Sequence, residues 1–110
     1  MKTETIKSIV KFRDDRNWRQ FHTPKALAIS LSLEASELLE IFQWTSSEQV
    51  DAEKVPYLEE ELADILIYSV LLADIIDADI DKIIETKLRK NAEKYPVEKS
   101  YGRKDKYNQL

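Results

Sequence analysis

The sequence predicts an all-α fold, a bundle of four to five helices that forms one domain over residues 1–110 and is completed by dimerisation. Three observations favour this fold. One glycine and three prolines leave few positions for the hairpin turns of a sheet. Apolar residues recur at helical spacing in four segments. The prolines, at positions 24, 56 and 96, stand at the ends of these segments, where helices accept proline.

The first helix is predicted from Thr5 to about Arg16, with apolar residues on one side and charged residues on the other. The connection that follows, residues 17–24, contains two aromatic residues and the single histidine of the chain: Trp18, Phe21 and His22. Aromatic side chains beside a charged site can stack on a planar ligand such as a nucleobase, or they can simply close the end of the bundle. The residues leave both interpretations open.

A second helix is predicted from Pro24 to Trp44, with Thr23 as its N-cap. Glu34 lies inside the apolar arc of this helix and Glu37 at its edge, since successive residues are about 100° apart. The arc itself consists of Leu27, Leu31, Leu38, Ile41 and Phe42. A carboxylate in a buried stripe loses hydration unless it is paired or bound to a metal, so Glu34 needs a partner.

A third helix is predicted from Pro56 to about Ile76, after a polar connector over residues 45–55 that contains a capping signal for a short helical turn. Glu61, Asp64 and Tyr68 group together beside its main apolar arc. That arc consists of Leu58, Leu62, Ile65, Ser69, Leu72, Ala73 and Ile76. Further apolar residues occupy other faces: Ile67, Val70, Leu71 and Ile75. A helix that is apolar almost all round is expected to be central or to lie at a subunit interface.

The last helix is predicted from Ile80 to Tyr95, with Asp79 as its N-cap and Pro96 as its stop. Two cations and an amide fall within or at the edge of its apolar arc: Lys87, Asn91 and Lys94. The lysines could pair with the acids or extend along their stems to solvent, and all three groups could bind phosphate oxygens. Residues 97–110 form a polar tail without helical periodicity.

Two acid pairs, Glu34-x-x-Glu37 and Glu61-x-x-Asp64, predict a metal site. The members of each pair lie three residues apart on a helix and therefore share a face. Oxygen ligands at this density suit Mg²⁺, with Mn²⁺ as a substitute, better than zinc. One such pair alone is more often a solvated helix face, but two pairs on inward-facing arcs favour the metal.

Composition excludes several classes of protein. The chain has 17 Lys and Arg against 21 Asp and Glu, a net charge of −4, which argues against a general nucleic-acid binder. Because there is no cysteine and no long apolar run, we expect no disulfide, signal peptide or membrane span, and a cytoplasmic location. A domain of this size would gain stability from oligomerisation.

From about Phe12 to Tyr107 the sequence resembles the MazG-like all-α nucleoside triphosphate pyrophosphohydrolases, in particular the small single-domain branch that includes dCTP pyrophosphatase. Four motifs, specific only in combination, carry the resemblance: Trp18-Arg19-Gln20-Phe21-His22, Glu34-x-x-Glu37 followed by Phe42-Gln43-Trp44, Glu61-Leu62-Ala63-Asp64 continuing to Tyr68, and Lys87-x-x-x-Asn91 ending at Lys94-Tyr95-Pro96. The glycine usual in the family before the first acid pair is absent, because Leu33 precedes Glu34. This departure leaves the subfamily open.

The resemblance implies an enzyme that hydrolyses nucleoside triphosphates, with dCTP or related dNTPs as the expected substrates, to a nucleoside monophosphate and pyrophosphate. Such an enzyme would remove unwanted nucleotides from the pool. The implied Mg²⁺ ligands are Glu34, Glu37, Glu61 and Asp64, and either Glu34 or Glu37 would position or deprotonate the water. The implied base and sugar contacts are Trp18, His22, Trp44 and Tyr68. The implied phosphate contacts are Lys87, Asn91 and Lys94. Members of the family act as dimers or tetramers, so a homodimer or homotetramer is expected.

Two other interpretations compete with this one. The chain could be a non-enzymatic helical-bundle interaction protein whose acidic residues face a partner. A di-iron carboxylate bundle is the other, but it requires two Glu-x-x-His pairs, and His22 lies outside the acid helices.

Overall fold

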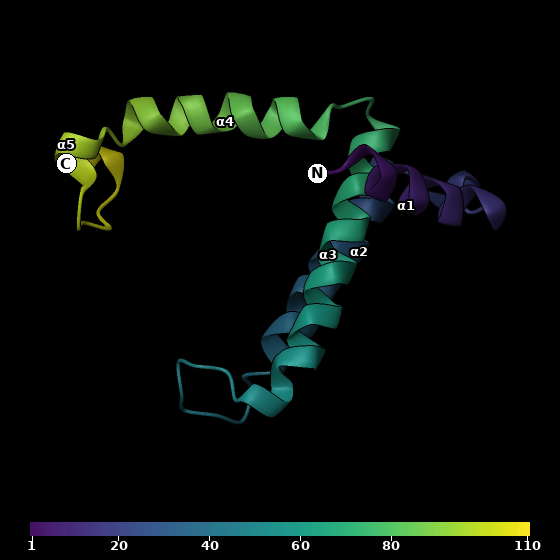
Figure 1. Ribbon diagram of the computed structural model, residues 1–110, viewed down its shortest axis with the longest axis horizontal. Coiled ribbons are helices and arrows are strands. Elements are labelled where there is room, and N and C mark those ends of the chain that lie inside the picture. The colour runs from purple at the N-terminus through teal and green to yellow at the C-terminus, as the bar shows by residue number, and fades with distance from the viewer. The chain divides into compact units, whose positions relative to one another are not determined.

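The computed structural model describes residues 1–110 and contains helices but no strand, which confirms the predicted all-α class (Figure 1). The α-helices are α1 (Thr3–Asp15), α2 (Pro24–Glu40), α3 (Val55–Ile75), α4 (Ile80–Lys94) and α5 (Val97–Ser100). Short 3₁₀ turns lie at Arg19–Phe21, Ala52–Lys54 and Tyr107–Gln109. The chain divides into two compact units, residues 1–78 and residues 79–110, and each is described by itself. A single-domain organisation stays a prediction.

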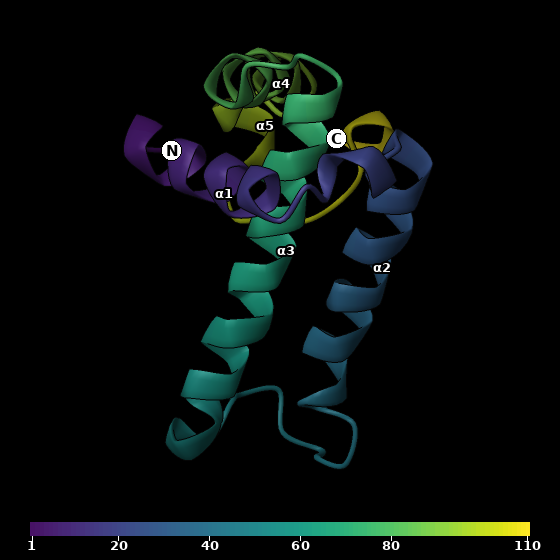
Figure 2. The same cartoon turned by 90° about the vertical axis from the view of Figure 1, so that its right-hand side faces the viewer.

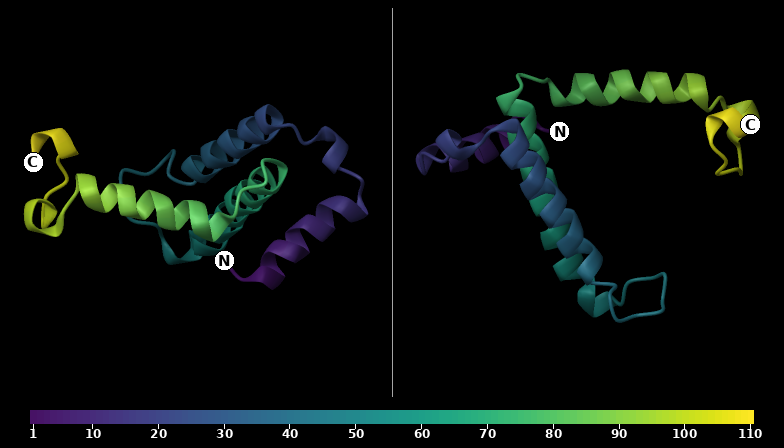
Figure 3. Two further views of the ribbon diagram at one scale, coloured as in Figure 1. Left: turned by 90° about the horizontal axis from the view of Figure 1, so that it is seen from above. Right: turned by 180° about the vertical axis from the view of Figure 1, so that it is seen from behind.

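The first unit is organised around the antiparallel pair of α2 and α3. The two helices lie side by side along most of their lengths in every view, and the connector over residues 41–54 joins them at one end (Figures 2 and 3). The amino end of α2 therefore lies beside the carboxyl end of α3. This arrangement fixes which residues of the two helices can meet.

Helix α1 packs against the carboxyl-terminal half of α3 (Figure 2). The buried apolar residues of the unit, Leu27, Val70, Leu71 and Ala73, include two that the helical wheel placed on faces of α3 other than its main arc, which agrees with the expectation of a central helix. Val70 and Leu71 are buried because α3 contacts α1 as well as α2. Two residues of the predicted main arc, Leu62 and Ile76, are exposed, so the prediction for these two side chains was wrong.

Most helix ends follow from local chemistry. The Thr23 hydroxyl accepts a hydrogen bond from the Ala26 N–H at 3.0 Å, with proline in the first turn of α2, and Asp79 caps α4 by accepting from the Lys82 N–H at 3.1 Å. Both predicted N-caps are thus confirmed. Asn17, beyond the end of α1, has a φ of 54°, which asparagine tolerates better than most residues.

Three boundaries differ from the prediction. Helix α2 ends at Glu40, four residues before Trp44, because the backbone N–H groups of residues 41–43 bond to the carbonyls three residues earlier and form turns. The hydroxyl of Thr45 accepts from the Ser47 N–H in a turn, and the short helical turn forms later in the connector. The polar tail contains α5 and the last 3₁₀ turn, which its lack of periodicity did not predict. No helix of the structure combines the length and apolar character needed to cross a membrane.

Thr23→Ala is expected to lower the free energy of unfolding by about 1 kcal/mol, because the Ala26 N–H loses its side-chain acceptor. Urea unfolding followed by circular dichroism measures the change. Thr5→Ala, at an exposed position of α1, is the matched control and should change stability by less than about 0.5 kcal/mol. Equal losses in both variants would contradict a capping role for Thr23.

Candidate metal centre

Three acidic side chains from two helices converge in the first unit. Glu34 of α2 and Glu61 and Asp64 of α3 each offer a carboxylate oxygen, and these oxygens all lie within 4.8 Å of one another. The antiparallel pairing brings them together, because Glu34 lies in the carboxyl-terminal half of α2 and the other two in the amino-terminal half of α3. The spacing of three residues aims Glu61 and Asp64 at the same face.

Glu37, the fourth predicted ligand, is exposed and lies one turn beyond Glu34 on α2. It is not one of the three acids whose oxygens converge within 4.8 Å. Its carboxylate is nonetheless close enough to act on the ionisation of both Glu34 and Glu61. Glu37 therefore borders the cluster.

The cluster is electrostatically strained. Burial, followed by the proximity of Glu37, Asp64 and Glu61, raises the pKa of Glu34 to about 7. Burial and Glu37 also raise the pKa of Glu61. One carboxylate oxygen of each, Oε2 in both cases, is buried without a hydrogen-bond partner. Burial of neighbouring carboxylates without partners is unfavourable in free energy, and a bound cation would stabilise this arrangement.

The donor set fits a hard divalent cation. It consists of carboxylate oxygens alone, and the two buried oxygens without partners supply acceptors that an ion would satisfy. The helices themselves provide no substitute, because α3 contains neither Lys nor Arg and α2 has only Lys25, in its first turn. The residues present therefore suit a magnesium-type site and lack the His or Cys that zinc prefers.

The aromatic loop, defined here as residues 17–22, leads from α1 into α2. The ring of Trp18 packs edge-on against Phe12 with 5.8 Å between centroids, and the Arg16 guanidinium lies 3.6 Å above the Phe12 ring. His22 has a buried Nδ1 without a hydrogen-bond partner. Burial, aided by the positive charge of Arg13, lowers the pKa of His22, so its imidazole is neutral at pH 7.

A single chain does not gather the three predicted base contacts. Trp18 and His22 precede the amino end of α2, whereas Trp44 follows its carboxyl end and is 91% exposed. At 1.5 Å per residue the 17-residue helix separates these ends by about 25 Å. Tyr68, half-buried, lies one turn beyond Asp64 on α3 and hence on the same side of the helix. The base and sugar pocket stays a prediction.

The predicted phosphate contacts belong to the second unit. Lys87, Asn91 and Lys94 share one side of α4, because they are spaced at i, i+4 and i+7. The Lys94 ammonium lies 4.9 Å from the centroid of the Tyr107 ring, which also meets the edge of Tyr95. Their role toward a phosphate stays a prediction.

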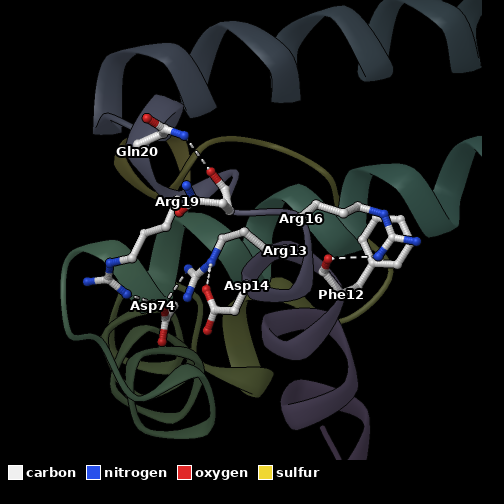
Figure 4. Close-up of polar contacts among 8 residues, drawn as sticks. Phe12, Arg13, Asp14, Arg16, Arg19, Gln20 and Asp74 are labelled. Carbon is white, nitrogen blue, oxygen red and sulfur yellow. Dashed lines mark hydrogen bonds and ion pairs between the residues drawn. The ribbon is translucent and has the colours of Figure 1, made fainter.

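Sequence reasoning missed a group of charges at the junction of α1 and α3. Arg13 is 1% exposed, and its Nη1 donates to Asp74 Oδ2 at 2.6 Å while its Nε donates to Asp14 Oδ1 at 2.8 Å (Figure 4). The first of these contacts links residues 61 positions apart. A signal was present, because Arg13 lies three residues after Val10 on the apolar side of α1. The Arg13 guanidinium also holds the pKa of Asp14 below its usual value.

The chain is similar in sequence and in structure to proteins that are named as pyrophosphatases. The chain is 39% identical over 109 residues to rat dCTP pyrophosphatase 1 and 35% identical over 109 residues to the human protein of that name. Each match covers 91% of this chain but 62% of the relative, so the chain spans about three-fifths of their length. The crystal structure of a pyrophosphatase from Archaeoglobus fulgidus is 43% identical and superimposes with a TM-score of 0.79, covering 84% of this chain and 90% of that one.

The model of the MazG-like family matches residues 29–110, a range that includes most of α2, with Glu34 and Glu37, and all of α3 and α4. That match covers most of the chain and agrees with the relatives and with the all-helical structure. The chain belongs to the MazG-like family.

Proposed function

We propose that this protein is a nucleoside triphosphate pyrophosphohydrolase that cleaves its substrate to a nucleoside monophosphate and pyrophosphate. The observation that carries the proposal is the convergence of Glu34, Glu61 and Asp64 within 4.8 Å, with two buried oxygens left without partners. The names of the relatives, dCTP pyrophosphatase 1 and a pyrophosphatase, agree in reaction class. We propose dCTP or related deoxynucleotides as substrates and removal of unwanted nucleotides as the role, in the cytoplasm.

We propose that Glu34, Glu37, Glu61 and Asp64 hold Mg²⁺, with Mn²⁺ as a substitute. When bound, the ion would supply Lewis acidity at the phosphate and offset the charge of the triphosphate. Burial first, and the neighbouring acids second, raise the pKa of Glu34, and a positive charge at the cluster would offset both.

The remaining steps fall to the side chains of the protein. Glu34 or Glu37 would position the attacking water and accept its proton. Trp18, His22 and Trp44 would contact the base, and a neutral His22 imidazole can donate or accept one hydrogen bond there. Tyr68 would lie near the sugar. Lys87, Asn91 and Lys94 would bind phosphate oxygens.

We propose a homodimer or homotetramer as the active form. Large apolar side chains are exposed along both acid helices: Ile29, Leu33 and Leu39 on α2, and Leu62, Leu66 and Ile67 on α3. Apolar surface of this extent marks an interface. A second chain would also offer a route to complete the base pocket, since Trp44 lies about 25 Å from Trp18 and His22 along α2.

A panel of ribo- and deoxyribonucleoside triphosphates should yield monophosphate and pyrophosphate with Mg²⁺ and no product with excess chelator. Product analysis by anion-exchange chromatography identifies the bond that is cleaved and ranks the bases. Release of orthophosphate would overturn the cleavage position. Absence of turnover with every nucleotide would favour the interaction-protein interpretation.

Glu61→Gln should lower turnover by about 100-fold or more, because an uncharged amide at a cluster position weakens cation binding. Steady-state kinetics measure the loss, and Mn²⁺ binding followed by electron paramagnetic resonance should weaken in parallel. Glu59→Gln, an exposed carboxylate two residues earlier on the same helix, is the control and should leave both unchanged. Full activity in Glu61→Gln would contradict the assignment of Glu61 as a ligand.

In chelator, the protein should lose stability as the pH rises from about 4.5 to about 7. The native state holds a proton on Glu34 up to about pH 7, whereas the unfolded chain releases it near 4.5, so ionisation disfavours folding in this range. Because Glu34 is only half-buried, solvent screening reduces the effect of the pKa shift, and we expect a loss on the order of 1 kcal/mol, measured by urea unfolding at both pH values. Mg²⁺ should restore stability at the higher pH, and Glu34→Gln should flatten the profile. If the free energy of unfolding of the wild-type protein did not change over this pH range, the pKa of Glu34 would not be raised in the native state.

A further inference from the structure

The ion-pair group at the junction of α1 and α3 takes no part in the proposed chemistry. It consists of Arg13, Asp14, Arg19 and Asp74, all within the first unit. Asp74 Oδ2 accepts from two arginines at once, from Arg13 Nη1 at 2.6 Å and from Arg19 Nη1 at 3.3 Å (Figure 4). One carboxylate near the end of α3 therefore receives a donor from α1 and another from the 3₁₀ turn of the aromatic loop.

The two arginines lie on either side of Trp18 in the sequence. The Arg13 carbonyl accepts hydrogen bonds from the Arg16 N–H at 3.2 Å and from the Trp18 N–H at 3.1 Å, so the same residue that contacts Asp74 also holds the Trp18 backbone. After Trp18, the Arg19 carbonyl accepts from the His22 N–H at 3.0 Å. Both ends of the segment that carries Trp18 are thereby tied to a single side chain of α3.

Folding alone does not require this arrangement. Arg13 lies on the apolar side of α1, where an apolar side chain of similar volume would avoid the cost of removing a guanidinium from water. Replacement of a buried ion pair by apolar residues is often neutral or stabilising. Directional donors, unlike apolar contacts, fix a segment in one orientation, which matters where the segment must present particular side chains.

We propose that Asp74, through Arg13 and Arg19, positions the aromatic loop against the α2–α3 pair and thereby sets nucleotide affinity and the choice of base. The inference rests on the proposed function for its kinetic consequence. Asp74 and Arg13 act through Trp18 and His22 and are positioning residues. They should therefore influence KM and base discrimination, while kcat depends on the acid cluster.

Asp74→Asn tests the proposal, because it keeps the shape of the side chain but removes the charge that both arginines share. We expect KM for the preferred nucleotide to rise by about fivefold or more, kcat to stay within about twofold, and discrimination between bases to fall. Asp14→Asn is the matched control, since Asp14 contacts the same buried guanidinium from within α1 and does not link it to α3. It should leave KM unchanged. An unchanged KM in Asp74→Asn would overturn the proposal.

The double variant Arg13→Met with Asp74→Leu separates positioning from stability. It should unfold at a urea concentration equal to or above that of the wild type, yet retain the raised KM. Wild-type KM in this stable double variant would overturn the proposal, because the ion pair would then serve folding alone.

A measurement without nucleotide distinguishes failure of this inference from failure of the proposed function. In a Trp44→Phe background, Trp18 is the single tryptophan, and Asp74→Asn should increase its acrylamide quenching while Asp14→Asn should not. Unchanged quenching would overturn the positioning of the loop even if the enzyme is active. Increased quenching, together with a wild-type protein that hydrolyses no nucleotide, would leave the positioning intact and refute the proposed function instead.

Discussion

The structure of the first unit depends on the register between α2 and α3. Their antiparallel packing brings Glu34 to within 4.8 Å of Glu61 and Asp64, and a slip of one residue in either helix would rotate its carboxylate away by about 100°. Apolar contacts around Leu27 and Val70 have to hold this register against the repulsion of the acids. The fold thus uses hydrophobic burial to maintain a charge arrangement that is unfavourable in the absence of a cation.

The two charged groups of the unit are balanced differently. At the junction of α1 and α3 the protein supplies its own cations, and Arg13 is buried because Asp14 and Asp74 neutralise it. At the acid cluster no Lys or Arg of either helix neutralises the carboxylates. The single cation of the two helices is Lys25, in the first turn of α2 and nine residues before Glu34. The first arrangement is neutralised within the chain, whereas the second lacks a counter-charge from either helix.

Much of this could be predicted from the sequence, because the relevant signals are local. Helical periodicity gave the four long helices, capping chemistry gave Thr23 and Asp79, and an acid on an apolar arc identified Glu34. The errors lie in tertiary packing. Leu62 and Ile76 of the predicted main arc are exposed, because a wheel for α3 alone does not say which of its faces α1 and α2 cover.

The pairing of Arg13 with Asp74 spans 61 residues, and no spacing rule connects them. The predicted base contacts show the same limit: Trp18 and His22 precede α2, whereas Trp44 follows it, so the three residues lie at opposite ends of one helix. Local sequence patterns can select candidate site residues, but they do not show which of these residues contact one another in the folded chain.

The hairpin of α2 and α3 also determines where the chain can tolerate changes in length. An added or lost residue between Leu27 and Glu34 would turn the acid out of its cluster, since the helix allows no compensating adjustment over two turns. The connector over residues 41–54, mostly exposed and held by local turns, can grow or shrink without moving either acid helix. Insertions that diversify this architecture would therefore accumulate in the connector, next to Trp44, and leave the acid cluster in place.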